Sequence, residues 1–253
     1  EVLGHTENTP PALLTASVAL GDMWPGAQEK AALTAGHSLV EYSALVCAGA
    51  MSFTDGVALV RKRGELMQAA VPNGQGTMAA VLGLDDEAIA QCCEQVAGEV
   101  SAANYNAPGQ VVIAGETDAV HAAIEACKAA GAKRAVPLDV SGPFHSRLME
   151  RAADDFSEAL SAIVLTLPEI PVYQNVHGQV AGSVDEMRQL LVQQLYSPVR
   201  WTTCVGALLD GGVGQFVECG PGSVLAGLVK RISRGTPTVG LSTAAGIEAA
   251  QAL

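Results

Sequence analysis

Three residues of this chain, Ser38, His145 and Arg63, have side chains that could supply a nucleophile, a general base and a partner for a carboxylate. Ser38 lies in residues 36–40, GHSLV, which lack only the last glycine of the nucleophile elbow G-x-S-x-G. In such an elbow a tight strand-to-helix turn exposes the serine, and the next backbone N–H, here that of Leu39, supplies half of an oxyanion hole. Ser38 could equally cap the helix that follows it. The pentapeptide alone leaves both interpretations open.

A nucleophilic serine needs a general base, and His145 in the loop SGPFHSRLM is the candidate. Asp139 precedes it closely, but the sequence does not fix the direction of its side chain, so a dyad and a triad both stay open. Arg63, in LVRKRGELMQ, could hold a carboxylate through two parallel hydrogen bonds, which lysine cannot copy. Taken singly, a loop histidine and a mid-helix arginine are more often surface residues.

These side chains need a strand and helices to position them. We expect a short strand over 31–35 and a helix over 38–50, with Glu41 in its first turn, where a negative charge meets the helix dipole favourably. A helix over 10–24 precedes this unit. A helix over 53–70 follows it and carries Arg63.

The rhythm changes over residues 75–140. Strands and helices there alternate as βαββαβ, which is the ferredoxin-like pattern and suggests an inserted subdomain. The expected strands are 77–83, 99–106, 110–116 and 133–140, and the expected helices are 85–97 and 117–131.

The rest of the chain predicts helices that alternate with strands. The expected helices are 148–163, 184–194, one ending near 212, and 223–233, and the expected strands are 170–176 and 213–220. The composition, 49% hydrophobic but only 4% aromatic, suits helices packed on a mostly parallel sheet. We therefore expect an α/β protein whose core, residues 1–74 and 141–253, is α/β-hydrolase-like and is interrupted by the ferredoxin-like subdomain, residues 75–140.

Charge and cysteine usage exclude several classes of protein. A net charge of -12 argues against nucleic-acid binding. The six cysteines form no CxxC pair and no metal-ligand spacing with the histidines, so we expect reduced thiols, a cytoplasmic location and no metal. No apolar run approaches the length of a membrane span, and no signal peptide is evident. Lysines and arginines are grouped at 61–63, 133–134, 147–151 and 230–234 and could form a basic surface.

Seven blocks of the chain together resemble one family. In order and spacing they are similar to the malonyl-CoA:acyl carrier protein transacylases of bacterial fatty acid synthesis, from about Thr6 to Arg234. The blocks are GHSLVEYSAL, LVRKRGELMQ, GTMAAVLGL, NYNAPGQVVIAG, ACKAAGAKRAVPLDVSGPFHSRLM, QLYSPVRWT and VECGPGSVLAGL.

The resemblance implies a ping-pong transfer of malonyl from malonyl-CoA, a substrate, to acyl carrier protein, without a cofactor. Ser38 would be the nucleophile, His145 the base, and Arg63 the partner of the malonyl carboxylate. The histidine would be oriented by a main-chain carbonyl near Gly211 instead of an acid. The further substrate-binding residues would be His37, Leu39, Asn104 and Asn106.

The chain departs from the family pattern at three places, one of which is Pro10, where members usually carry glutamine. It begins downstream of the G-Q-G-S-Q loop whose glutamine supplies the second oxyanion N–H, so we expect an N-terminally truncated member. Val40 replaces the elbow glycine; we expect it to crowd the elbow, turn Ser38 away from His145 and lower activity.

The rival functions are a serine thioesterase or esterase, and a homologue that binds acyl carrier protein without transferring anything.

Overall fold

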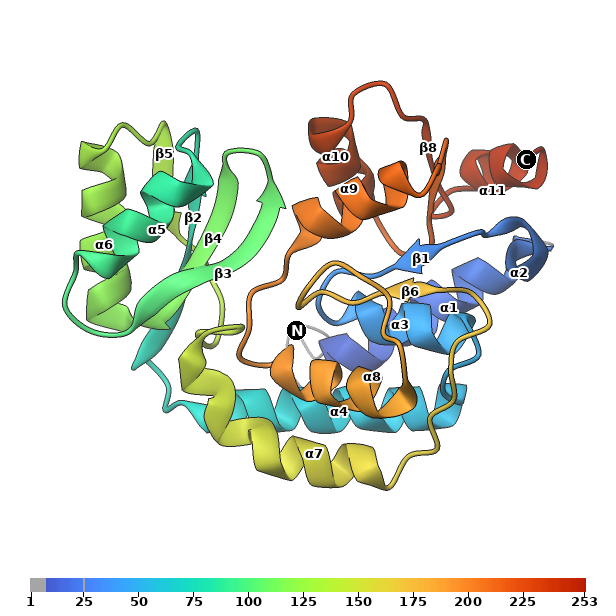
Figure 1. Ribbon diagram of the computed structural model, residues 1–253, viewed down its shortest axis with the longest axis horizontal. Coiled ribbons are helices and arrows are strands. Elements are labelled where there is room, and N and C mark those ends of the chain that lie inside the picture. Colours follow the sequence, from blue (N-terminus) through green and yellow to red (C-terminus); the bar gives the residue numbers. More distant parts are fainter. Residues whose placement is uncertain (1–7, 25) are drawn as a thin grey trace.

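The computed structural model describes residues 8–24 and 26–253 and is an α/β structure. Thr6, where the resemblance begins, lies outside these residues. Two parts stand beside each other, one around strands β2 to β5 and one containing the other elements (Figure 1).

The first part has the expected order βαββαβ. Its elements are β2 (Gly76–Leu82), α5 (Asp86–Glu94), β3 (Val100–Ala107), β4 (Gln110–Glu116), α6 (Thr117–Ala129) and β5 (Arg134–Pro137). The four strands pair antiparallel in the order β3-β4-β2-β5. The apolar sides of α5 and α6 pack on this sheet through residues such as Ile89 and Ile124. β5 ends earlier than expected, at Pro137, which has no N–H to donate.

The largest hydrophobic core lies between helices of the second part. These helices are α1 (Thr9–Asp22), α3 (Val40–Cys47), α4 (Phe53–Ala70), α7 (Ala153–Ser161) and α8 (Val184–Gln193). The buried positions of α4 include Leu59, Val60, Arg63 and Met67, a spacing that places them on one face of the helix. The helix expected over 148–163 is a 3₁₀ helix, η2 (Arg147–Ala152), followed by α7.

The strands of the second part are much shorter than expected. β1 (Thr34–Ala35) pairs parallel with β6 (Val172–Tyr173), and β7 (Phe216–Glu218) pairs parallel with β8 (Thr238–Gly240). The alanines around β1 favour strands only weakly. A cavity of about 730 Å³ is lined by residues of both β1 and β7. Instead of one mostly parallel sheet, the described residues form two separate parallel pairs.

Helices cover the C-terminal half of the second part. α9 (Trp201–Asp210) and α10 (Val224–Ile232) agree with expectation. Two helices and one strand were not anticipated from the sequence: α2 (Ala27–Lys30), α11 (Ala244–Gln251) and β8.

Strand β3 joins the two parts. The Tyr105 N–H donates to the carbonyl of Val199 at 2.9 Å, and the Val199 N–H donates to the carbonyl of Ala103 at 2.8 Å. The stretch of chain before α9 therefore continues the edge of the four-stranded sheet. This contact brings the asparagines of β3 next to the loop that follows β1.

Candidate active site

Ser38 occupies a tight turn between β1 and α3. Its φ of 53° lies in the left-handed region, and it shares this property only with His145 among the non-glycine residues that the structure describes. Such backbone conformations cost of order 1–3 kcal/mol and cluster at functional sites. Gly36 makes the turn possible, because a Cβ there would lie 2.1 Å from the carbonyl carbon and oxygen of Val40.

The two strained residues face each other. Ser38 Oγ lies 2.7 Å from His145 Nε2. His145 Nδ1 lies 2.7 Å from the carbonyl oxygen of Gln194, so Nδ1 carries the proton and Nε2 is free to accept one from Ser38. The expectation that a carbonyl near Gly211 orients the histidine is wrong, since Gln194 at the end of α8 supplies it. In the described part of the chain the exposed Asp139 forms no hydrogen bond with Ser38 or His145, so the pair is a dyad.

His145 is held neutral. Burial, and after it the nearby charge of Arg63, lower its pKa from 6.5 to about 3. A neutral imidazole at ordinary pH is the form that can take a proton from a serine. The pair is thus ready for nucleophilic attack without a prior loss of a proton to solvent.

Arg63 lies beside the pair, on the buried face of α4, with 5% of its surface exposed. Its Nη2 donates to Ser38 Oγ at 3.2 Å and to Gln194 Oε1 at 2.9 Å. The guanidinium stands over the ring of Tyr42, at 5.5 Å from the ring centroid. The buried Nε has no hydrogen-bond partner within the described part of the chain. A cation with an unused donor next to a nucleophile is suited to an anionic substrate group.

The oxyanion side of the turn is open. α3 begins at Val40 with Leu39 as its N-cap residue and without a side-chain cap, so Ser38 does not cap the helix. No acceptor for the Leu39 N–H is found among residues 8–24 and 26–253. Val40 lines the 730 Å³ cavity, and the expected rotation of Ser38 away from His145 is not found. Lower activity caused by Val40 stays a prediction.

His37 and the asparagines of β3 lie at the junction of the two parts. His37 Nε2 lies 2.7 Å from Asn106 Oδ1, and the imidazole packs edge-on against Trp201 at 5.6 Å between ring centroids. Burial lowers the pKa of His37, so its ring is neutral. Asn104 is buried and forms a parallel bridge with Val199. In this arrangement His37 and Asn106 tie the nucleophile turn to β3.

Sequence reasoning missed three buried polar residues around the dyad: Glu41, Asn175 and Gln194. Asn175 Oδ1 accepts from the Ser38 N–H at 2.6 Å, and its Nδ2 donates to the carbonyl of Gly36 at 2.7 Å. Asn175 follows a buried strand and Gln194 ends an amphipathic helix, which is the only signal that could have singled them out. Glu41 was expected only to place a negative charge favourably in the first turn of the helix. In the structure it is buried, with 1% of its surface exposed.

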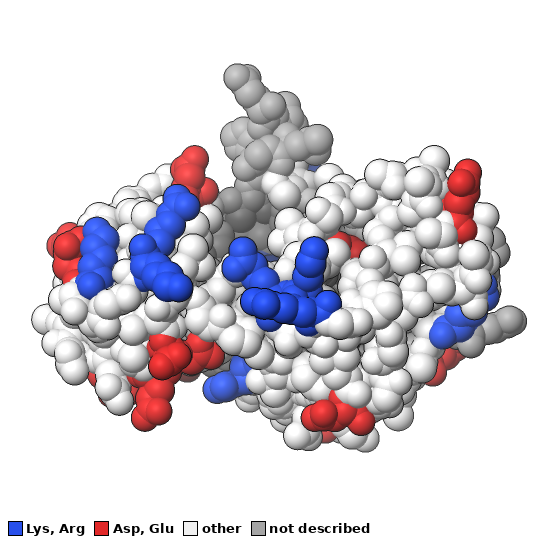
Figure 2. Space-filling model, turned by 90° about the horizontal axis from the view of Figure 1, so that it is seen from above, with Lys and Arg blue, Asp and Glu red and all other residues white. Residues whose placement is uncertain are grey.

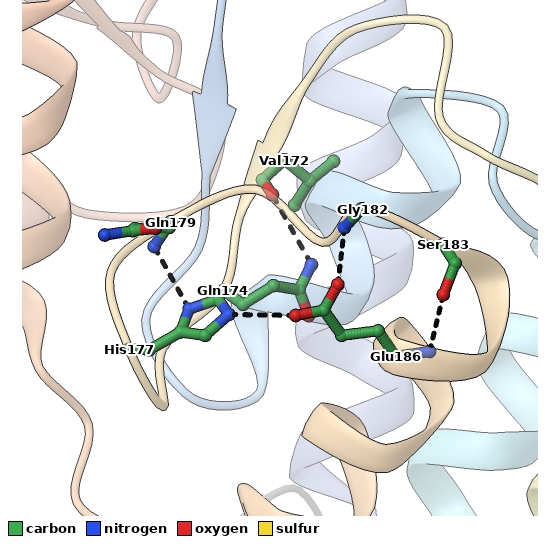
Figure 3. A network of polar contacts seen from close by, with 7 residues as sticks. All are labelled: Val172, Gln174, His177, Gln179, Gly182, Ser183 and Glu186. Atoms are coloured by element: carbon green, nitrogen blue, oxygen red, sulfur yellow. Dashed lines mark hydrogen bonds and ion pairs between the residues drawn. The ribbon is translucent and has the colours of Figure 1, made fainter.

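The loop between β6 and α8, which carries Asn175, is held by its own polar contacts (Figure 3). Glu186 accepts from the Gly182 N–H at 2.6 Å, while its own N–H donates to Ser183 Oγ at 3.1 Å. This reciprocal arrangement satisfies N–H groups at the start of α8. His177 Nε2 lies 3.9 Å from the same carboxylate. The loop therefore presents Asn175 in one defined position.

Replacing Glu41 by glutamine is expected to change how stability depends on pH. Burial raises the pKa of Glu41 from 4.5 to about 7. Between these values the folded state binds more protons than the unfolded state, so this carboxyl costs stability as pH rises. Glutamine does not titrate, so Glu41→Gln should gain up to roughly 3 kcal/mol relative to the parent between about pH 5 and about pH 7.5. Urea unfolding at both pH values measures this, and a constant difference would contradict it.

The described residues contain neither a metal-binding cluster nor a membrane-spanning helix. No three side chains of His, Cys, Asp or Glu in that part of the chain are grouped so that they could hold a metal ion. None of the helices described is both long enough and apolar enough to cross a membrane.

Lys and Arg side chains gather in two groups on the face seen in Figure 2, one over the part with β5 and α6 and one near α10. The basic residues at 133–134 and 230–231 are exposed, as are those at 147 and 151. The net charge is -12, so these groups are locally basic areas on an acidic molecule.

Comparisons with known proteins agree on one family. The model of the acyl transferase domain matches residues 1–247. The malonyl CoA-acyl carrier protein transacylase of Escherichia coli K12 is 54% identical over 235 residues, which cover 92% of this chain and 76% of the relative. The protein of that name from Bacillus subtilis is 48% identical over 253 residues, covering 99% of this chain and 80% of the relative.

Solved structures agree as well. A type II polyketide acyl-carrier protein in complex with its malonyl-transacylase matches with 48% identity and a TM-score of 0.95, over 99% of this chain and 82% of the other. An acyl carrier protein S-malonyltransferase from Vibrio cholerae matches with 49% identity and a TM-score of 0.95, over 98% and 82%.

Proposed function

Because the chain belongs to the acyl transferase family, we propose that it transfers a malonyl group from malonyl-CoA to the phosphopantetheine thiol of acyl carrier protein, in fatty acid synthesis. The observation that carries this proposal is the contact of 2.7 Å between Ser38 Oγ and His145 Nε2, with the Arg63 guanidinium beside it. A nucleophile, a base and a carboxylate-binding cation are the three groups that malonyl transfer needs.

In the first half-reaction, Ser38 Oγ attacks the thioester carbonyl of malonyl-CoA and its proton passes to His145 Nε2. The Leu39 N–H faces the negative charge that forms on the carbonyl oxygen. The carbon–sulfur bond then breaks, and the proton on Nε2 goes to the departing thiol of coenzyme A. A malonyl ester of Ser38 and a neutral His145 remain.

The second half-reaction runs the same steps in the opposite direction. His145 Nε2 takes the proton of the phosphopantetheine thiol, and the thiolate attacks the malonyl ester. The ester bond to Ser38 Oγ breaks, and Oγ takes back the proton from Nε2. Neither step needs a redox group or a metal, so we propose that the enzyme works without a cofactor.

Arg63→Ala is expected to remove the preference for malonyl over acetyl. The guanidinium would pair with the malonyl carboxylate, a charged hydrogen bond whose loss lowers kcat/KM for malonyl-CoA about 10- to 100-fold. Acetyl-CoA has no such carboxylate, so its kcat/KM should change much less. Steady-state rates with both thioesters test this, with the exposed Arg234→Ala, outside the proposed docking residues, as the matched control. Equal losses for both substrates would contradict the role.

The acyl carrier protein is an acidic partner, and the exposed basic groups give it a place to dock. We propose that the carrier approaches over the basic residues near His145 and Arg63, at 147–151 and 61–62. Without local positive charge, a molecule of charge -12 would repel such a partner. His37, Asn104 and Asn106 would line the path of the pantetheine arm.

The division of the chain belongs to the same proposal. We infer that residues 75–140 form a ferredoxin-like subdomain inserted in an α/β-hydrolase-like core of residues 1–74 and 141–253. The βαββαβ order, the strand order β3-β4-β2-β5 and a hydrophobic core of its own support the insert. All six cysteines are free, which fits a cytoplasmic location.

One experiment tests the proposed function against its rivals. The protein is incubated with malonyl-CoA and pure acyl carrier protein, and malonyl-carrier and free malonate are both quantified. Mostly malonyl-carrier supports the transferase. Mostly free malonate indicates a thioesterase, and neither product indicates a protein that only binds the carrier.

A further inference from the structure

Glu41 is a buried carboxylate that the mechanism above does not use. Its Oε2 accepts two hydrogen bonds, from the backbone N–H of Asn175 at 2.9 Å and from Gln194 Nε2 at 2.9 Å. These donors lie on different segments, after β6 and after α8. A single oxygen on α3 therefore holds together two segments that are distant in the chain.

Both partners of Glu41 reach the reacting groups. Gln194 contacts three of them: its carbonyl accepts from His145 Nδ1, its Oε1 accepts from Arg63 Nη2, and its Nε2 donates to the carbonyl of Ser38 at 3.2 Å. No hydrogen bond or ion pair between Glu41 and Arg63 is found in the described residues. The amide of Gln194 stands between the carboxylate and the guanidinium.

Asn175 completes the connection to the nucleophile. Its side chain bonds the Ser38 N–H and the carbonyl of Gly36, the two backbone groups that flank the elbow. Its backbone N–H is the group held by Glu41. Glu41 is therefore one hydrogen-bonded residue away from Ser38, from His145 and from Arg63.

We propose that Glu41 is a positioning residue for acyl transfer, whose Oε2 fixes Gln194 and Asn175 and through them the relative places of Ser38, His145 and Arg63. This inference rests on the proposed function only for the identity of the acyl group that is transferred. The hydrogen bonds that place Ser38, His145 and Arg63 do not depend on it. What matters is the place of the accepting oxygen, because both donors meet the same atom. A glutamine at 41 can put its carbonyl oxygen there. An aspartate cannot, because its side chain is shorter by one bond of about 1.5 Å.

The test compares Glu41→Gln, which keeps reach and loses charge, with Glu41→Asp, which keeps charge and loses reach. Two readouts are measured: the rate at which a sulfonyl fluoride modifies Ser38, by intact mass, and kcat/KM for malonyl-CoA and acetyl-CoA. We expect Glu41→Gln to stay within about fivefold of the parent in both. We expect Glu41→Asp to lower the rate of Ser38 modification about 100-fold, which is the loss expected when reacting groups are displaced by about 1 Å. We also expect it to lose the preference for malonyl-CoA over acetyl-CoA.

Ser43→Ala is the matched control. Ser43 is also buried on α3, and its Oγ has no hydrogen-bond partner among the described residues, so its side chain is not bonded to the reacting groups. Its replacement should leave both readouts unchanged. Thermal unfolding of every variant separates a lower rate of the folded protein from a loss of folded protein.

The outcomes decide between positioning and other roles. A folded Glu41→Asp that equals the parent overturns the inference, as does a folded Glu41→Gln that falls as far as Glu41→Asp. If Glu41→Asp does not fold, the variant Gln194→Leu takes its place in the test. It keeps the backbone carbonyl that accepts from His145 but removes the side-chain amide that connects Glu41 with Arg63. A Gln194→Leu variant with unchanged malonyl preference overturns the inference. A parent that never transfers malonyl refutes the proposed function, while the sulfonyl fluoride rates still test Glu41.

Discussion

Replacing Ser38 by alanine is expected to lower malonyl transfer by about 10⁴-fold or more, because no other nucleophile among the described residues is hydrogen-bonded to His145. Its Oγ is the atom that both His145 Nε2 and Arg63 Nη2 contact. Without it no malonyl ester can form on the protein. Intact mass after incubation with malonyl-CoA should show an adduct on the parent and none on Ser38→Ala.

The control for this change is again Ser43→Ala, five residues further along the chain, which should acylate like the parent. Far-UV circular dichroism checks that Ser38→Ala is folded, since alanine tolerates the turn no worse than serine does. An adduct on Ser38→Ala equal to that of the parent would mean that another residue carries the acyl group. It would also remove the observation on which the proposed function rests.

The sequence predicts the reacting residues better than it predicts the buried polar residues that hold them in place. Ser38 and Arg63 each lie in a short block, GHSLV and LVRKRGELMQ, and these blocks single them out only together with the family resemblance. Gln194 contacts Ser38 across 156 residues and Arg63 across 131 residues. A glutamine at a helix end has no local pattern that announces such contacts. The carbonyl acceptor for His145 was therefore expected near Gly211, at the end of α9, whereas it lies at Gln194, at the end of α8.

The same contrast holds for the fold. The helix α4 begins and ends where its periodicity predicts, at Phe53 and Ala70, because one apolar stripe faces the core along its whole length. The parallel strands β1, β6 and β7 are two or three residues long, against five to eight expected. Apolar runs at these places predict burial but not hydrogen-bonded pairing, which depends on partners far along the chain.

His145→Ala is expected to slow acylation of Ser38 by about 10²- to 10⁴-fold, because the hydroxyl loses the one base that the described residues place within hydrogen-bonding distance. Single-turnover formation of the malonyl adduct measures this. In the parent the same rate should show no acid limb near pH 6.5, since burial holds the pKa of His145 at about 3. A limb near 6.5 that disappears in His145→Ala would contradict the buried, neutral histidine.

The same residue links activity to stability. Because the folded pKa of His145 lies below the unfolded value of 6.5, its neutral form contributes stability above about pH 6.5. That contribution is lost as pH falls towards 3, where the folded protein would have to bury a charged imidazole beside Arg63. His145→Ala removes this titration, so its stability relative to the parent should rise from about pH 6.5 to about pH 4. Urea unfolding across this range, with the exposed His121→Ala as control, tests the sign, and a flat difference would place His145 in water and not in the buried site.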